Sequence, residues 1–343
     1  MKHKAGRSIL SRRPFLCFSF WRALFHTNWI VVFSYHERHE VRYNTKIVLI
    51  HHTKEVPPVP QFSERIVPPL PPLESLLPHE AEIVRARWDG DPRIHTPSGY
   101  ALESEATAYF KAADVPDSPY FPQIDFYHSY SHGSLSILPC FRTYQQTRGY
   151  TCASAIALMT LYHFGVFDWE ELQIADKMAS FHGLPPDTRR PIPVRDLAMF
   201  FQSLGWDVES NLECAARAPE DNHIYDPWRA EKAKTFKTLE DFAAFCKRTI
   251  RSGAPIMVEN IDWGAHWRVI IGYDDMGTGK AEHGVLILSD PHDTADHCQD
   301  GYVVEHIDKF YSMWYDIFVM ERDECTQPFV VARPPWMKGA GAI

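Results

Sequence analysis

The clearest pattern of apolar positions in the chain lies within residues 152–164. Apolar residues recur there at positions i, i+3, i+4 and i+7, namely Ala155, Leu158, Met159 and Tyr162. More apolar residues stand between them, so the spacing predicts a helix that is buried on most of its sides. Gly165 follows the pattern and is suited to end the helix.

Further along the chain, the periodicity changes between helix and strand. Amphipathic spacing predicts helices at 168–179, 194–204, 238–252 and 306–315. Short apolar runs bounded by turn residues predict strands at 206–210, 255–261, 266–273, 285–289 and 317–320. Because helices come first and strands follow, we expect an α+β fold with a helical lobe, an antiparallel β-sheet lobe and an active-site cleft between them.

The composition changes along the chain and suggests its domain organisation. Eight prolines fall within residues 56–78, and prolines at this density prevent both helices and central strands. We therefore expect a basic and aromatic N-terminal segment (1–55), a proline-rich linker (56–79) and an N-terminal extension that packs on the domain (80–137). The main domain is then expected at 138–325 and a C-terminal tail at 326–343.

Charge excludes some classes of function. The chain of 343 residues has 35 basic and 44 acidic side chains, and six of the basic ones lie in residues 1–36, which contain no acid. The remainder carries 29 basic and 44 acidic residues, a net charge of −15. A nucleic-acid partner is not expected, because binding to phosphates depends on lysine and arginine.

The N-terminal segment raises the question of cellular location. No apolar stretch reaches the ~20 residues needed to cross a bilayer, so no integral membrane span is expected. Arg12 and Arg13 with the residues around them resemble a twin-arginine export signal, but no small-residue cleavage site follows. We favour an accessory or mis-called segment and a cytoplasmic location, with export as the alternative.

One cysteine stands out among the seven. These are scattered and contain no C-x-x-C pair, so neither a disulfide scaffold nor a zinc ribbon is indicated. Cys152 lies at the beginning of the predicted helix, where free N–H groups and the helix dipole stabilise a thiolate. Taken alone, Cys152 is better interpreted as a small buried side chain, the usual role of a free cysteine.

Three other residues complete a chemical pattern around Cys152. Gln146 precedes the cysteine by six residues, so that its amide and the backbone N–H of Cys152 are suited to form an oxyanion hole. His266 begins one predicted strand and Asp290 follows the next. These two side chains are expected to meet at one edge of the sheet, where the aspartate orients the imidazole and the imidazole takes the thiol proton.

These residues carry a family resemblance. The blocks Gln146-x5-Cys152 with Ala-Ser-Ala-Ile-Ala-Leu-Met, Gly-Ala-His266-Trp-Arg-Val-Ile-Ile-Gly-Tyr and Leu-Ile-Leu-Ser-Asp290-Pro resemble the papain-like cysteine peptidases of the bacteriocin-processing type, cysteine-peptidase family thirty-nine. The resemblance covers residues 138–320. It implies a papain-like fold, a peptide or protein substrate, and roles for Cys152 as nucleophile, His266 as base, Asp290 as orienter and Gln146 as oxyanion donor. The chain departs from the family in having Ala153 where glycine is common.

The pattern leaves alternatives open. The principal expectation is hydrolysis of a peptide or amide bond through an acyl-enzyme, without a cofactor. Acyl transfer of the transglutaminase type uses the same three residue types, and a catalytically silent peptide-binding module retains the same fold. Arg268 shares the strand face of His266, and we expect it to pair with a neighbouring acid.

The segment 290–298 is rich in aspartate and histidine but has neither zinc nor EF-hand spacing. We interpret it as a solvated acidic loop rather than as a metal site. The sequence alone gives no oligomeric state.

Overall fold

The computed structural model describes residues 67–103, 124–212, 235–261, 265–293, 300–317, 320 and 325–337. Residues 1–66 lie outside these ranges, and so do the expectations about export and about the start of the chain. Among the described residues, no helix combines the length and the apolar character needed to cross a lipid bilayer.

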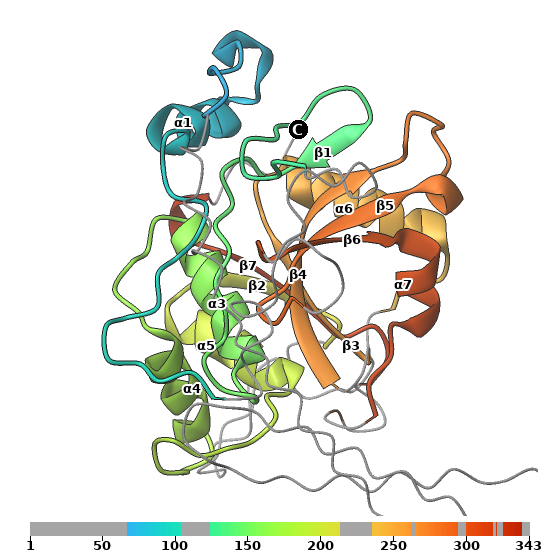
Figure 1. The fold of residues 1–343 in the computed structure, drawn as a ribbon. Helices are drawn as coiled ribbons and strands as arrows, with labels where there is room; N and C mark the ends of the chain where they lie inside the picture. Colours follow the sequence, from blue (N-terminus) through green and yellow to red (C-terminus); the bar gives the residue numbers. More distant parts are fainter. Residues whose placement is uncertain are drawn as a thin grey trace, which may run out of the picture. The chain divides into compact units, whose positions relative to one another are not determined.

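The expected α+β fold class is confirmed (Figure 1). Seven strands form one antiparallel sheet in the order β2-β7-β3-β4-β5-β6, with β1 paired to one end of β4. The strands are β1 (Leu135–Ile137), β2 (Asp207–Ser210), β3 (Ile256–Ile261), β4 (Ala265–Asp274), β5 (Val285–Ser289), β6 (Tyr302–His306) and β7 (Phe329–Arg333).

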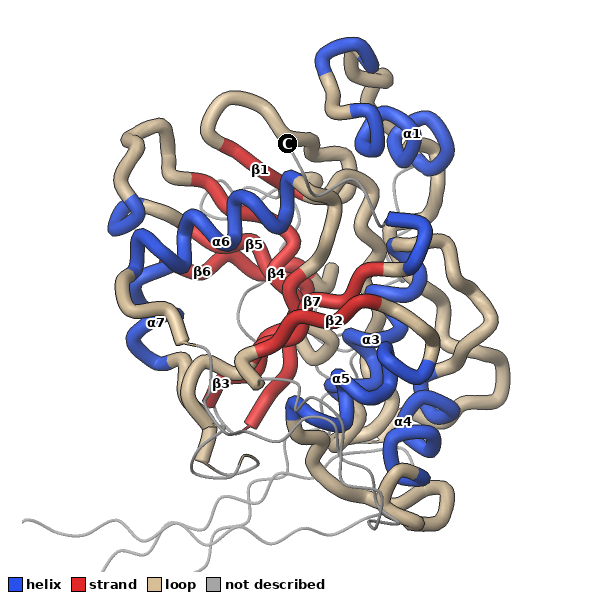
Figure 2. Tube along the Cα trace, turned by 180° about the vertical axis from the view of Figure 1, so that it is seen from behind, coloured by secondary structure: helices blue, strands red, loops and turns tan. Residues whose placement is uncertain are grey.

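The helices cover the sheet in two groups (Figures 1 and 2). One group consists of α3 (Cys152–His163), α4 (Glu171–Ser180) and α5 (Val194–Ser203), and α3 packs on β4. The other consists of α6 (Leu239–Arg251), which packs on β4 and crosses in front of the sheet in the view from behind (Figure 2), and α7 (Ile307–Met313), which contacts α6 and β6. The helix α1 (Pro78–Arg87) and the short 3-10 helices at Leu73–Ser75, Ala281–His283 and Pro335–Met337 complete the described elements.

The helices form where the sequence pattern predicts them. Ten of the twelve residues of α3 are buried, as expected for a helix that is apolar on all sides. In α6, the Thr238 side chain accepts a hydrogen bond from the backbone of Asp241 and caps the helix. Its buried residues Phe242, Phe245, Cys246, Thr249 and Ile250 follow the i, i+3, i+4, i+7, i+8 spacing. They pack with Phe236, Phe310, Trp314 and Phe329 in a continuous aromatic core.

Two parts of the structure differ from the expected domain limits. Residues 329–333, expected in a C-terminal tail, form β7 inside the sheet between β2 and β3. Their Phe-Val-Val-Ala run is fully buried, and backbone pairing on both sides satisfies its polar groups. The end of the proline-rich linker also packs on the domain, because Leu76 is buried in the core and the Trp88 indole donates to the carbonyl of Pro68 at 2.6 Å.

Candidate active site

Cys152 is the first residue of α3. Thr151 precedes it as the N-cap residue, and the Thr151 side chain makes no capping hydrogen bond to the helix backbone. The Cys152 N–H is therefore one of the helix donors that have no partner within the helix. The side chain is partly exposed, whereas Cys140, Cys246 and Cys325 are buried. Cys152 thus combines accessibility with a position at the positive end of the helix dipole.

His266 and Asp290 meet at the edge of the sheet, as their positions in the sequence predict. His266 lies at the beginning of β4 and Asp290 directly follows β5, its antiparallel neighbour. The distance from His266 Nε2 to Asp290 Oδ1 is 2.7 Å, and the residues are 3% and 2% exposed. The same Asp290 oxygen accepts the backbone N–H groups of His292 and Asp293 at 2.8 and 3.1 Å.

Burial and charge act in opposite directions on this pair. Burial is the largest single effect on His266 and lowers its pKa, but the charge of Asp290 and the hydrogen bonds with Asp290 and Cys152 together raise the pKa to about 10. Burial is also the largest single effect on Asp290 and raises its pKa, but the charge and hydrogen bond of His266, the charge of Arg268 and the His292 backbone N–H together hold that pKa below the ordinary value of 3.8. The two groups therefore form an ion pair at neutral pH.

The thiol of Cys152 lies against this ion pair. A hydrogen bond between the Cys152 side chain and the His266 ring helps to raise the pKa of His266. Because Nε2 is bonded to Asp290, Nδ1 is the ring nitrogen that faces the thiol. The structure thus brings three of the four residues predicted from the sequence into one chain of contacts, from Cys152 through His266 to Asp290.

Gln146 does not join this chain through its side chain. Its Nε2 donates to the carbonyl of Arg148 at 2.8 Å, and its Oε1 has no hydrogen-bond partner among the described residues. The backbone N–H of Gln146 donates to the carbonyl of Pro291 at 2.9 Å, which fixes its loop beside Asp290. A carboxamide carries two N–H donors, so one remains for a substrate.

Arg268 has the structural role that the sequence predicts. Its guanidinium donates to Asn260 Oδ1 at 2.9 Å and to Glu305 Oε2 at 3.0 Å, and the residue is 2% exposed. It is also close enough to Asp290 to lower the pKa of that carboxyl further. Arg268 is therefore a buried cation whose charge is balanced by the carboxylate of Glu305 in β6.

The segment after Asp290 is less exposed than expected. Its described part is not a solvated loop, because Asp290, His292 and Asp293 are all buried. Asp293 accepts the backbone N–H of Gly301 at 2.8 Å, so this part of the segment is folded against β6. Residues 294–299 lie outside the described residues. Among those that are described, no group of three or more histidine, cysteine, aspartate or glutamate side chains is arranged to hold a metal ion.

A second buried acid near Cys152 was not predicted from the sequence. Glu259 in β3 is 1% exposed, and its Oε2 has no hydrogen-bond partner among the described residues. Burial raises the pKa of Glu259 well above its ordinary value, and a hydrogen bond with the buried Asp316 and the charge of Cys152 raise it further. Burial and the neighbouring acid therefore favour the protonated, neutral form of Glu259. The sequence signal for Glu259 is an acidic residue within a short, largely apolar run that is predicted to be a strand.

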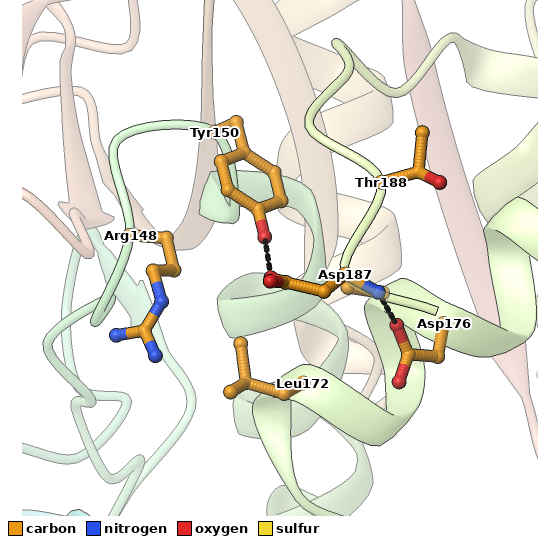
Figure 3. Close-up of a pocket in the computed structure, with 7 residues that line it drawn as sticks. Arg148, Tyr150, Leu172, Asp176, Asp187 and Thr188 are labelled. Atoms are coloured by element: carbon orange, nitrogen blue, oxygen red, sulfur yellow. Dashed lines mark hydrogen bonds between the residues drawn. The ribbon is translucent and has the colours of Figure 1, made fainter. Parts of the chain in front are cut away.

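A polar pocket lies between α4 and the loop that precedes Cys152 (residues 144–151, the cysteine loop) (Figure 3). Its cavity of about 220 Å³ is lined by Arg148, Tyr150, Leu172, Ala175, Asp176, Asp187 and Thr188. The Tyr150 hydroxyl donates to Asp187 at 3.0 Å, and burial together with this hydrogen bond raises the pKa of Tyr150 to about 12. The backbone N–H of Asp187 donates to Asp176 at 2.7 Å, so these contacts join the cysteine loop to α4.

Comparison with known proteins identifies the family. The family model described as "Peptidase_C39 like family" matches residues 138–317, just over half of the chain. Among solved structures, the peptidase domain of Streptococcus ComA, a bi-functional ABC transporter involved in a quorum-sensing pathway, is 14% identical; the match covers 57% of this chain and 98% of that one, with a TM-score of 0.32. No curated protein matches the chain. The family match confirms the resemblance carried by the three sequence blocks, and the chain belongs to the Peptidase_C39-like family of papain-like cysteine peptidases.

Proposed function

We propose that this protein hydrolyses a peptide bond with Cys152 as the nucleophile, His266 as the acid–base group, Asp290 as its orienting partner and Gln146 as an oxyanion donor. The observation that carries the proposal is the contact of a partly exposed helix-terminal thiol with a buried histidine–aspartate ion pair. A catalytically silent module has no need to keep these three groups aligned. Family membership supports a peptide or protein as the substrate.

The chemistry follows from the arrangement of charges. The Cys152 thiolate attacks the carbonyl carbon, and the carbonyl oxygen becomes an oxyanion that accepts from the Cys152 N–H and from the free N–H of Gln146. The His266 imidazolium then gives its proton to the leaving amine, and an acyl-enzyme remains. Water attacks this thioester while His266 takes a proton from it, and the acid product leaves with the thiol restored.

The proposal is tested by the rate at which iodoacetamide labels each cysteine, read by peptide mass spectrometry across pH. We expect rapid labelling of Cys152 at pH 6, where an ordinary thiol with a pKa of about 8.5 is almost fully protonated. The buried cysteines Cys140 and Cys246 serve as internal references in the same sample. His266→Ala should slow the labelling of Cys152 at pH 6, whereas His283→Ala, which removes an exposed histidine, should not.

Two outcomes would overturn the proposal. If Cys152 of the wild-type protein is labelled only at pH values typical of ordinary thiols, the binding module becomes the better interpretation. If labelling at pH 6 is rapid but does not depend on His266, the ion pair has no part in activating the thiol. Loss of peptide hydrolysis in Cys152→Ala, measured against a peptide library, then connects the reactive thiol to the reaction.

A further inference from the structure

Glu171 is a fully buried carboxylate that the reaction described above does not use. It is the first residue of α4 and is 0% exposed. Burial of an unpaired carboxylate is unfavourable, and burial accordingly raises the pKa of Glu171 above its ordinary value. Hydrogen bonds from neutral donors, the nearest of which belong to Thr147 and Thr151, oppose that shift.

All the donors to Glu171 come from one short segment of the chain. The backbone N–H and the hydroxyl of Thr147 donate to it at 2.8 and 2.5 Å, and the Tyr144 hydroxyl donates at 3.1 Å. The hydroxyl of Thr151 donates to the same carboxylate. Four donors within residues 144–151 therefore converge on a single side chain from another helix.

This segment carries the proposed oxyanion donor and leads directly to the proposed nucleophile. Gln146 lies between Tyr144 and Thr147, and Thr151 is the N-cap residue before Cys152. The opposite side of the segment is held by the hydrogen bond from Gln146 N–H to the carbonyl of Pro291, next to Asp290. Figure 3 shows Arg148 and Tyr150 of this segment facing Leu172, the residue after Glu171. The segment is thus fixed between α4 and the histidine–aspartate pair.

We propose that Glu171 is a positioning residue whose carboxylate holds residues 144–151 so that Cys152 stays against His266 and Gln146 stays beside the oxyanion. This inference rests on the proposed function. An ionised carboxylate accepts all four hydrogen bonds, whereas protonation converts one of its oxygens into a donor. The positioning role therefore requires the ionised form of the Glu171 carboxyl.

The test compares three variants by iodoacetamide labelling of Cys152 at pH 6 and pH 9. Glu171→Ala removes every acceptor, and we expect labelling at pH 6 to slow at least tenfold while labelling at pH 9, where most thiols are ionised, changes less than twofold. Glu171→Gln retains the size and one acceptor oxygen, so its rate at pH 6 should lie between those of Glu171→Ala and the wild type. Thermal unfolding of each variant shows that it is folded at the assay temperature.

Glu170→Gln is the matched control. Glu170 is the adjacent carboxylate at the same helix end, but it accepts from Tyr100 at 2.7 Å and does not contact residues 144–151 through its side chain. Its labelling rate should stay within twofold of the wild type at both pH values. A purely structural role for charge at this helix end would affect both glutamates alike.

The outcomes separate the two proposals. Rapid wild-type labelling at pH 6 that is unchanged in a folded Glu171→Ala or Glu171→Gln protein would overturn the positioning role and leave the proposed function intact. Ordinary labelling of Cys152 in the wild type would remove the proposed function, and the positioning role with it. If Glu171→Ala does not fold, Glu171→Gln alone decides the test. A Cys152 labelling rate at pH 6 equal to that of Glu170→Gln would contradict the positioning role.

Discussion

Asp290 and Glu259 are buried acids from the strands on either side of β4, and the pKa values of their carboxyls are shifted in opposite directions. Asp290 follows β5 at one side of His266, and Glu259 lies in β3 at the other. Both are buried to almost the same extent, 2% and 1% exposed. The pKa of Asp290 is nevertheless below its ordinary value, and that of Glu259 is well above it.

The difference comes from the charge of the partners. Burial raises the pKa of both carboxyls, but Asp290 has the positive charges of His266 and Arg268 nearby and accepts backbone N–H groups. Glu259 has another acid, Asp316, as its partner, and the charge of Cys152 adds to the repulsion. Burial alone therefore does not determine whether an acid beside the thiol is charged, and only one of these two carboxyls can stabilise an imidazolium.

The largest effect is expected from Asp290→Asn, which removes the charge but retains the shape. The pKa of His266 should fall, because Asp290 is the main group that raises it, and the thiolate–imidazolium pair should then be lost at pH 6. We expect peptide hydrolysis to drop by about 10²–10⁴-fold. Asp308→Asn, at an exposed acid in the first turn of α7, is the matched control and should leave the rate unchanged. An equal loss in both variants would contradict the role of Asp290.

The next effect concerns stability at the same side of the sheet. Arg268→Ala leaves Glu305 without its buried partner and removes a positive charge near Asp290, so we expect a loss of about 3 kcal/mol in the free energy of unfolding by urea. Lys309→Ala removes the exposed partner of the same Glu305, at 2.9 Å, and should cost less than about 1 kcal/mol. Similar losses in the two variants would show that the buried ion pair of Arg268 contributes no more to the free energy of unfolding than the exposed pair of Lys309.

A smaller effect should appear in the pH dependence of stability. The raised pKa of His266 stabilises the fold fully below pH 6.5, and this contribution is lost as the pH rises through about 10. The lowered pKa of Asp290 contributes above pH 3.8 and is lost on acidification. The melting temperatures of the wild type and Asp290→Asn should therefore differ most between pH 4 and 6.5, on the order of 5–10 °C, and should converge toward pH 10. A constant difference from pH 5 to pH 10 would exclude the ion pair as its source.

The smallest effect is expected from Glu259→Gln. Because burial and the neighbouring Asp316 favour the neutral form of Glu259, the amide closely matches its size and charge, and peptide hydrolysis should change by less than about threefold. A rate reduced as far as in Asp290→Asn would mean that Glu259 is ionised when the enzyme works. The kinetic measurement on these two variants, side by side, tests the contrast between the two carboxyls directly.

The long periodic elements of the fold could be predicted from the sequence, whereas among the shorter strands β2 was predicted, at 206–210, and others were not. The helices α3, α5 and α6 and the strands β3, β4 and β5 form where apolar spacing places them. The strands β6 and β7 were missed, because runs as short as Tyr302–Val304 and Phe329–Ala332 do not by themselves distinguish a strand from a tail. Pairing with distant strands decides their structure.

The candidate site shows the same limit. The proximity of His266 and Asp290 could be predicted, because the start of one strand and the end of its antiparallel neighbour share an edge. Glu171 and Glu259 could not be recognised, since their roles depend on what they face. The sequence predicts a helix from residue 168, whereas α4 begins at Glu171 after the N-cap residue Glu170, and the Glu171 side chain accepts from Thr147 and Thr151.

The place of β7 in the sheet also affects how the protein matures during synthesis. The strand β2 is joined to the rest of the sheet through β7, which is made about 120 residues later. Until residues 329–333 have left the ribosome, β2 has no strand to pair with in the sheet and β3 is paired on one side only, by β4. The order of translation therefore delays closure of the sheet until Cys152, His266 and Asp290 have all been made.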